Sequence, residues 1–278
     1  MTGAAPATGV PPLRPFERIR AQCAGLGAWR MPAPGAGSGP LVVCFVSNGY
    51  RVGPNRIEFG RLVSSSGRPA LFFAEAAKAF YSTAGLADRI TQMVREEMER
   101  VGAASAVTIG FSQGGFGAIA FAERFPVHLA LALSPRWSPD SGIVADARGI
   151  ERKGALPFPT LAPGLQALGR AVVLHGMRGP DRRHLRRFPA MPLLEHWLLF
   201  RAGHEVHHEM RRLNLFAETF LDVLSDDPDS AVARFRAAGL HRAGSLGARI
   251  AMAAAALTPR RFFPSLSTDR IPQSGARP

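Results

Sequence analysis

Short runs of consecutive apolar residues recur along the chain, and β-branched residues are frequent among them. A run that is apolar at every position is typical of a strand buried on both faces of a sheet, because a strand with one exposed face alternates apolar and polar residues. These runs lie at 41–46, 70–73, 106–109, 129–133, 171–174 and 194–200, with Thr108, Glu195 and His196 as the polar exceptions. The pattern predicts the buried strands of a mostly parallel sheet.

Stretches with apolar residues at helical spacing separate several of these runs. The clearest spans 84–101, and 114–124 and 205–224 follow. Strands that alternate with helices are typical of a parallel sheet whose two faces are both covered by helices. The sequence therefore predicts an α/β fold, with a mostly parallel sheet flanked by helices on both faces.

The predicted domain spans 41–225 and is preceded by a flexible segment and linker over 1–40. Proline and glycine dominate 32–40, which is the composition of a linker. One short helix is predicted over 16–26. Within the domain, the interval 134–168 lacks periodicity, so it is either a small cap or lid insertion over a site or a surface loop between two strands.

The C-terminal part is predicted to hold helices over 226–257 and a disordered tail over 258–278. Two short periodic segments, 229–238 and 245–257, carry the helices. The tail is composed largely of proline, serine and arginine and has too few apolar residues to form a core.

Composition narrows the class of protein. The chain has 278 residues, of which 46% are hydrophobic, and this is enough for one ordinary globular domain. No uninterrupted apolar run reaches the roughly 18 residues of a membrane-spanning helix, and the first residues lack the apolar stretch of a secretory signal. The expected location is the cytoplasm, with which the two cysteines, Cys23 and Cys44, agree as free thiols.

The formal net charge is +13, and almost all of the positive charge is arginine. A basic surface can attract nucleic acid, anionic lipid or acidic substrates. The arginines are nevertheless scattered over the chain, and no interleaved aromatic residues or recognition motif accompany them. We therefore expect no nucleic-acid partner, and the oligomeric state stays open.

One segment carries a pattern with chemical meaning. The apolar run 106–109 leads directly into Gly110-Phe111-Ser112-Gln113-Gly114, and a small-residue helical stretch follows. A strand, a G-x-S-x-G turn and a helix in this order are what a nucleophile elbow requires. Such a turn lifts the serine hydroxyl clear of the sheet and aims the positive end of the helix dipole at the reacting group.

With this elbow the chain resembles the α/β-hydrolase superfamily of serine hydrolases, over roughly 41–215. The resemblance implies the α/β-hydrolase fold and acyl-transfer chemistry, with Ser112 as nucleophile. It also implies an acid in the loop after the strand at 171–174, where Asp181 stands, and a base after the last strand, where His204 stands. All three follow parallel strands, so they are expected at one edge of the sheet.

Other residues compete for two of these roles. Asp140, at the start of the irregular interval, is the reserve acid, and His207 and His208 are alternative bases. The expected oxyanion donors are the backbone amides of Gln113, which follows the nucleophile, and of Tyr50 in the loop after the strand at 41–46. Many family members carry His-Gly in that loop, whereas this chain has Asn-Gly.

The densest basic cluster begins at the predicted acid and spans 181–187. It is either the solvated face of a short helix or a rim that receives an anionic part of the substrate, with Arg182 and Arg183 as the contacts. If these arginines receive an anionic group, a carrier-linked acyl substrate fits the cluster. If they only face the solvent, a small-molecule ester fits equally well.

A competing motif includes the predicted base. The residues His204-Glu205-Val206-His207-His208 spell H-E-x-x-H, a zinc-binding pattern in which His204 and His208 are ligands and Glu205 is the general base. The pattern requires a position well inside a helix and a third ligand downstream, for which Glu218 is the candidate. Gly203 instead places His204 at a helix start, so zinc is the minor alternative.

The sequence thus predicts a serine hydrolase that cleaves an ester or thioester through an acyl-enzyme intermediate, with Ser112, His204 and Asp181 as the triad and no cofactor. An acyltransferase and a non-catalytic binding protein on the same fold are the alternatives, and a zinc metallohydrolase is the minor one. Acyl length, the choice between ester and thioester, and the choice between hydrolysis and transfer do not follow from the sequence.

Overall fold

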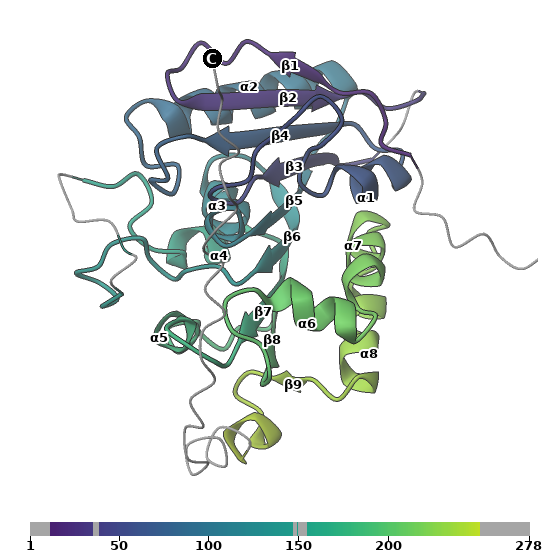
Figure 1. The fold of residues 1–278 in the computed structure, drawn as a ribbon. Helices are drawn as coiled ribbons and strands as arrows, with labels where there is room; N and C mark the ends of the chain where they lie inside the picture. Colours follow the sequence, from purple (N-terminus) through teal and green to yellow (C-terminus); the bar gives the residue numbers. More distant parts are fainter. Residues whose placement is uncertain (1–11, 36–38, 147–148, 150–154, 251–278) are drawn as a thin grey trace, which may run out of the picture.

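The computed structural model describes residues 12–35, 39–146, 149 and 155–250. Its described part contains a nine-stranded sheet in the order β1-β2-β4-β3-β5-β6-β7-β8-β9 (Figure 1). The central strands run parallel, while β1, β2 and β9 pair antiparallel at the two ends. The strands are β1 (Glu17–Ile19), β2 (Leu26–Met31), β3 (Leu41–Phe45), β4 (Ala70–Glu75), β5 (Ala106–Phe111), β6 (Val127–Leu133), β7 (Arg170–Gly176), β8 (Leu194–Leu199) and β9 (His241–Arg242).

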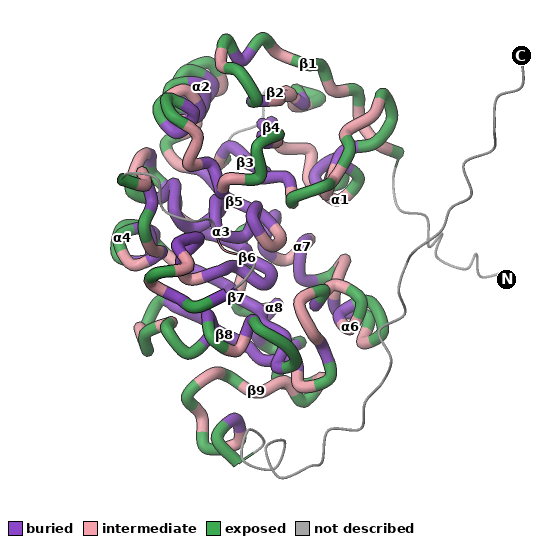
Figure 2. The backbone as a smooth tube through the Cα atoms, turned by 60° about the vertical axis from the view of Figure 1, so that its left-hand side comes forward, coloured by how far each residue is buried: buried purple, intermediate pink, exposed green. Residues whose placement is uncertain are grey.

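Helices cover both faces of this sheet (Figures 1 and 2). They are α1 (Gly60–Ser65), α2 (Leu86–Val101), α3 (Gln113–Ala120), continued by a 3-10 turn at Phe121–Glu123, α4 (Ala162–Ala167), α5 (Asp181–Leu185), α6 (Val206–Arg212), α7 (Phe216–Leu224) and α8 (Pro228–Ala237). The prediction of an α/β fold with a mostly parallel, doubly covered sheet is confirmed.

Two separate cores explain why β3 is apolar at every position. Along β3, Leu41, Val43 and Phe45 enter the core beneath α2 and α3, while Val42 and Cys44 enter the core beneath α7 and α8. All five side chains are fully buried. Successive side chains point to opposite faces of a strand, so a sheet with helices on both faces needs apolar residues at each step.

The prediction at the N-terminal end was wrong. Instead of a helix over 16–26, residues 17–31 form β1 and β2, which pair with each other and extend the sheet beyond β4. A turn with positive φ at Gln22 (53°) and Gly25 (76°) reverses the chain between them. The sheet therefore begins inside the segment that the composition marked as flexible.

Three further expectations changed in detail. The helix predicted over 205–224 is divided into α6 and α7, because Asn214 adopts φ 55° and turns the chain. Within the described part of the interval 134–168, Ala162–Ala167 forms α4, which packs against α3 and its 3-10 extension, and the other described residues are irregular. The helix predicted over 229–238 is present as α8, whereas residues 251–278, with the predicted tail, lie outside the described residues.

Over the part of the chain that the structure describes, no helix combines the length and the apolar character that crossing a bilayer requires.

Candidate active site

The nucleophile elbow predicted at Ser112 is present between β5 and α3. Ser112 has φ 56° and ψ −116°, a conformation that L residues rarely adopt, and it ends the strand abruptly. Its amide donates a hydrogen bond to the carbonyl of Leu133 at 2.8 Å, which holds the strained turn against the end of β6. The serine hydroxyl therefore stands at the carboxyl edge of the sheet.

Two glycines make this turn sterically feasible. A Cβ atom on Gly110 would overlap the backbone of Gly114, and one on Gly114 would overlap the carbonyl of Phe45 in β3. The helix thus approaches both its own strand and the neighbouring strand more closely than any side chain permits. The glycines of the motif are requirements of packing, not of chemistry.

Gly114→Ala is expected to lower the free energy of unfolding by about 3 kcal/mol or more, because the added methyl group has only backbone atoms beside it. Denaturant unfolding measures this loss. Gly53→Ala is the matched control: no atom lies within 4 Å of its added Cβ, and its φ is not positive, so its effect should stay within about 0.5 kcal/mol. If both variants lost the same free energy of unfolding, the explanation that position 114 lies too close to the β3 backbone for a side chain would be contradicted.

The loops after β7 and β8 are held together by backbone contacts. The amide of Arg178 donates to the carbonyl of Ala202 at 2.9 Å, and a Cβ atom on Gly176 would overlap the carbonyl of Gly203. The hydroxyl of Ser134, after β6, donates to the carbonyl of His204 at 2.6 Å. Three strand ends thus fix the position of the loop that carries His204.

The side chains of Ser112, His204 and Asp181 form a continuous hydrogen-bonded chain. His204 Nε2 lies 2.8 Å from Ser112 Oγ, and His204 Nδ1 lies 2.7 Å from Asp181 Oδ2. An ionised carboxylate only accepts hydrogen bonds, so Nδ1 carries the proton and Nε2 is free to accept from the hydroxyl. Asp181 has only 3% of its side chain exposed, whereas His204 has 27% exposed. The imidazole is therefore oriented from the buried side and accessible from the other.

The competing residues lie elsewhere. Asp140 accepts from the amide of Gly142 at 2.7 Å, within its own turn. The ring of His207 packs against Phe111, with 5.1 Å between centroids, and His208 Nε2 pairs with Glu205. Of the acids and bases that the sequence offers, the structure brings Asp181 and His204 to the serine.

The geometry gives no support to a zinc site built from the H-E-x-x-H pattern. His204 precedes α6, whose first residue is Val206, so it does not share a helix face with His208. Both of its ring nitrogens already face Asp181 and Ser112. A helical position is the physical requirement of that motif, and His204 lacks it.

Gln113 is the first residue of α3, where a backbone amide has no partner within the helix. Its side chain is 1% exposed and donates to Glu75 at 3.1 Å. Glu75 also accepts from the amides of Ala79 and Tyr81, at 3.0 and 2.7 Å. Glu75 is thus a buried carboxylate that fixes the start of α3, the helix that faces Ser112. The sequence did not predict this role.

The loop after β3 carries the other expected oxyanion donor, Tyr50. Its amide donates to the carbonyl of Ser47 at 3.2 Å, inside a turn. Tyr50 therefore remains a prediction, and it could hold an oxyanion only after this turn opens. The same loop is anchored by Glu58, which accepts from both the amide and the hydroxyl of Ser47, the latter at 2.8 Å.

Burial raises the pKa of Glu58 to about 7, against the hydrogen bonds from Ser47, which lower it. Between about pH 4.5 and 7 the folded protein therefore binds a proton at Glu58 that the unfolded chain does not, so this group's contribution to stability falls as the pH rises through that window. Glutamine mimics the protonated acid.

Glu58→Gln is expected to unfold like the parent at about pH 5 and to be more stable than the parent at about pH 8, by up to about 3 kcal/mol. Denaturant unfolding at the two pH values measures the difference. Glu218→Gln, at an exposed glutamate on the same cavity, should show no such pH-dependent difference. If the free energy of unfolding differed between parent and Glu58→Gln by the same amount at both pH values, the raised pKa of Glu58 would be contradicted.

A pair of buried histidines lies beside the loop that carries Asp181, and the sequence did not predict this pair. His175 and His196 are buried, and their rings meet with His175 Nδ1 2.9 Å from His196 Nε2. His175 Nε2 lies 2.8 Å from the carbonyl of Pro135. Burial lowers the pKa of His175 to about 4, so both rings serve as neutral hydrogen-bonding groups that join β6, β7 and β8.

The predicted rim arginines lie in α5, directly after the acid. Arg183 is exposed, and its guanidinium donates to the carbonyl of Ala145; Arg182 is partly buried. Nothing in these contacts tests a role in substrate binding, so that role stays a prediction.

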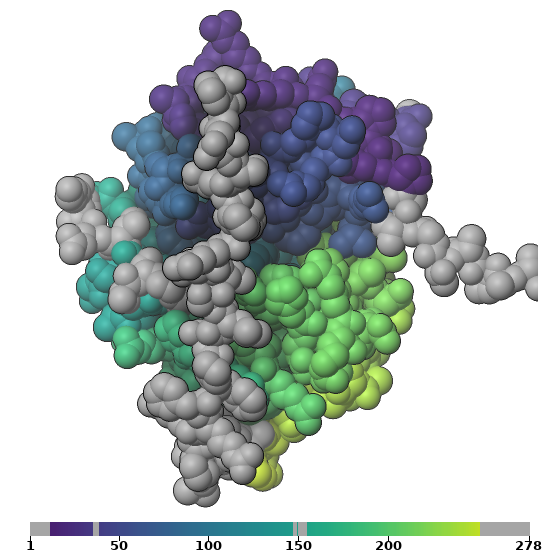
Figure 3. Space-filling view, viewed as in Figure 1, coloured from purple at the N-terminus to yellow at the C-terminus, as the bar shows by residue number. Residues whose placement is uncertain are grey.

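A cavity of about 960 Å³ lies next to Phe111; its wall includes two glutamates, Glu58 and Glu218, and none of the three triad residues. It lies between the loop after β3, the segment before α1, and helices α6 and α7, whose surfaces meet in Figure 3. Phe111, next to the nucleophile, belongs to its wall and packs its ring 5.2 Å from that of His204. The other walls mix aromatic and aliphatic side chains with three arginines: Arg56, Arg61 and Arg211.

No family model and no curated protein matches this chain. Solved structures do match its fold. An esterase from Pyrobaculum calidifontis has a TM-score of 0.52 at 16% identity, with 80% of this chain and 87% of the esterase covered. An acylaminoacyl peptidase from Pyrococcus horikoshii has a TM-score of 0.54 at 12% identity, with 76% of this chain covered.

A third match is the Glycosylation Associate Protein (Gap123) complex from Streptococcus agalactiae, with a TM-score of 0.52 at 16% identity and 76% of this chain covered. This chain spans 47% of that protein and 41% of the peptidase, less than half of each. Together with the strand order and the elbow, these likenesses define the class: the chain has the α/β-hydrolase fold.

Proposed function

We propose that this protein is a serine hydrolase that cleaves an ester or thioester through an acyl-enzyme intermediate. The observation that carries the proposal is the hydrogen-bonded chain from Ser112 through His204 to Asp181, at the elbow between β5 and α3. A serine hydroxyl is a weak nucleophile at neutral pH, and a base at 2.8 Å with a buried carboxylate behind it is what activates it.

The reaction follows from these contacts. As the Ser112 Oγ–carbon bond forms, the hydroxyl proton passes to His204 Nε2, and Asp181 stabilises the resulting imidazolium through Nδ1–H. His204 then returns the proton to the leaving alcohol or thiol as its bond to the acyl carbon breaks. A water molecule next gives a proton to His204 and attacks the acyl-enzyme, and the proton returns to Ser112 Oγ as the acid leaves.

The backbone amide of Gln113 is proposed to donate to the oxyanion that forms in both steps. It stands at the start of α3, where the helix dipole is positive. Amide donors of this kind typically contribute about 10²- to 10³-fold to turnover. Glu75 supports this donor by holding the Gln113 side chain.

The cavity beside Phe111 is proposed to take part of the substrate. Its aromatic and aliphatic walls suit an acyl or alkyl group, while its arginines suit a negative charge on the same molecule. This combination fits a small-molecule ester with an anionic group or a carrier-linked acyl thioester. Measuring kcat/KM over a series of acyl lengths, with and without a carboxylate on the substrate, would separate these substrates.

A fluorophosphonate probe tests the proposal directly. It is expected to add one adduct per chain, located by peptide mass spectrometry on Ser112, and heat-denatured protein is expected to stay unlabelled. A folded protein that takes no label would contradict the serine hydrolase assignment and leave a non-catalytic binding protein on the same fold. Product analysis with a second alcohol present would then distinguish hydrolysis from acyl transfer, since both pass through the same intermediate.

A further inference from the structure

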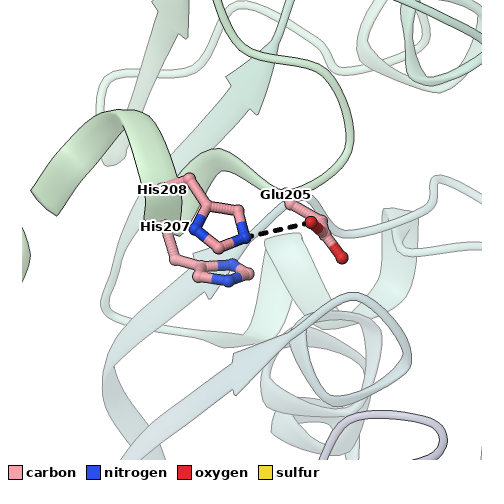
Figure 4. Close-up of side chains that lie close together, drawn as sticks. All are labelled: Glu205, His207 and His208. Atoms are coloured by element: carbon pink, nitrogen blue, oxygen red, sulfur yellow. Dashed lines mark ion pairs between the residues drawn. The ribbon is translucent and has the colours of Figure 1, made fainter. Parts of the chain in front are cut away.

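Three metal-ligating side chains gather where α6 begins, apart from the triad. Glu205, His207 and His208 each offer one donor atom, and these atoms all lie within 4.8 Å of one another. Figure 4 shows the two imidazoles side by side with the carboxylate facing His208. Their ring centroids are 4.2 Å apart. Such a group needs an explanation, because none of its members takes part in the proton transfers proposed for hydrolysis, although His207 also lines the cavity beside Phe111.

The backbone explains how residues so close in sequence can face one point. In a regular helix, residues two apart do not share a face. Glu205, however, is the residue that caps α6, and its φ of −83° and ψ of 65° are not helical. Its side chain therefore turns back toward the first turn of the helix, where it meets His208 at 3.1 Å between Oε2 and Nε2.

The donor types suit a tetrahedral metal ion, and the three donor atoms lie close enough to converge on one. Zinc ligands lie about 2.0–2.2 Å from the ion, which places two donors of a tetrahedron about 3.3 Å apart. The Glu205–His208 pair is already at 3.1 Å. Both side chains are largely exposed, 64% and 67%, so they can adjust to the ion at little cost. Two imidazoles and one carboxylate are a donor set that zinc sites use, with a fourth position for water.

The imidazole ring of His207 is held in place by its neighbours. The ring packs against Phe111, with 5.1 Å between the two centroids, and this contact restrains the imidazole beside Glu205 and His208.

We infer that Glu205, His207 and His208 form a binding site for a divalent transition-metal ion of the zinc type, beside the active site and separate from it. This set differs from the H-E-x-x-H set, since it excludes His204. Its three ligands take no part in the proton transfers proposed for hydrolysis, although His207 also lines the cavity beside Phe111, so a test of metal binding does not depend on the proposed function.

Calorimetric titration of the untagged full-length protein with Zn²⁺, and separately with Mg²⁺, tests the inference. One Zn²⁺ per chain is expected to bind at neutral pH, while Mg²⁺, which prefers oxygen ligands, should not bind. His208→Ala and Glu205→Gln should each weaken Zn²⁺ binding at least about tenfold, as loss of a ligand requires. Because both side chains are exposed, these variants should unfold like the parent.

Two further variants locate the ion. His128→Ala removes another histidine paired with one carboxylate, Asp226, at 2.7 Å, and should leave Zn²⁺ binding unchanged. His204→Ala should also leave it unchanged. If Zn²⁺ binding were lost in His204→Ala, or kept at full strength in His208→Ala, the ion would lie at the triad or elsewhere and the inference would be overturned. Absence of Zn²⁺ binding in the parent would overturn it as well.

Discussion

Ser112→Ala is expected to lower kcat for hydrolysis of an activated ester, such as a p-nitrophenyl ester, by about 10⁴-fold or more. The hydroxyl 2.8 Å from His204 is the atom proposed to form the bond to the acyl group, and neither His204 nor Gln113 can replace it. Alanine keeps the Cβ atom and so places no new demand on the φ of 56° at this turn. The loss should therefore be one of chemistry rather than of folding.

The measurement is initial-rate kinetics on parent and variant, together with the free energy of unfolding of each. Ser65→Ala, at an exposed serine that bonds only within its own helix turn, should keep the parent rate. If Ser112→Ala retained more than about a tenth of the parent kcat, another residue would be the nucleophile.

Asp181→Asn is the second large effect, and we expect it to lower kcat by about 10⁴-fold, the magnitude known for this change in serine proteases. The carboxylate accepts from His204 Nδ1 at 2.7 Å and so fixes the tautomer whose Nε2 can take the serine proton. An asparagine amide can instead donate to Nδ1, and the proton then sits on Nε2, where it blocks the transfer. Only 3% of the Asp181 side chain is exposed, so solvent cannot replace the lost interaction with His204 Nδ1.

Asp229→Asn and Asp140→Asn are the controls. Asp229 is an exposed aspartate that pairs with Arg170 at 2.6 Å, so its replacement should leave kcat unchanged. Asp140, the reserve acid, is buried and bonded inside its own turn, so its replacement should affect stability more than kcat. A loss of rate in Asp140→Asn as large as that in Asp181→Asn would contradict the assignment of the acid.

Much of the fold could be predicted from local pattern. The runs that became β3 to β8 are apolar at nearly every position, with Thr108, Glu195 and His196 as the exceptions, and a strand with that pattern is stable only between two covered faces. The segments whose structure was predicted wrongly lack such a pattern. The strand β1, Glu17–Ile19, falls within the range predicted as a helix; it has only three residues, stands at the edge of the sheet and is not fully buried at any position, so no apolar run marks it.

The supporting carboxylates could not be predicted for a different reason. Glu75 and Glu58 act through partners 38 and 11 residues away, Gln113 and Ser47, and no short motif relates such positions. The same holds for His175, whose partner His196 lies on the adjacent strand. Their buried surroundings arise only when the strands and loops are assembled, and so do their altered protonation and hydrogen bonds.

The sequence by itself determined the order strand, elbow, helix around Ser112, because the glycines, the apolar run and the small residues are all local requirements of that turn. It also placed an acid and a base after later strands. Only the tertiary structure decided between Asp181 and Asp140, and among His204, His207 and His208. Hydrogen bonds of less than 3 Å depend on how three loops pack at one sheet edge, and that packing is set by contacts far apart in the sequence.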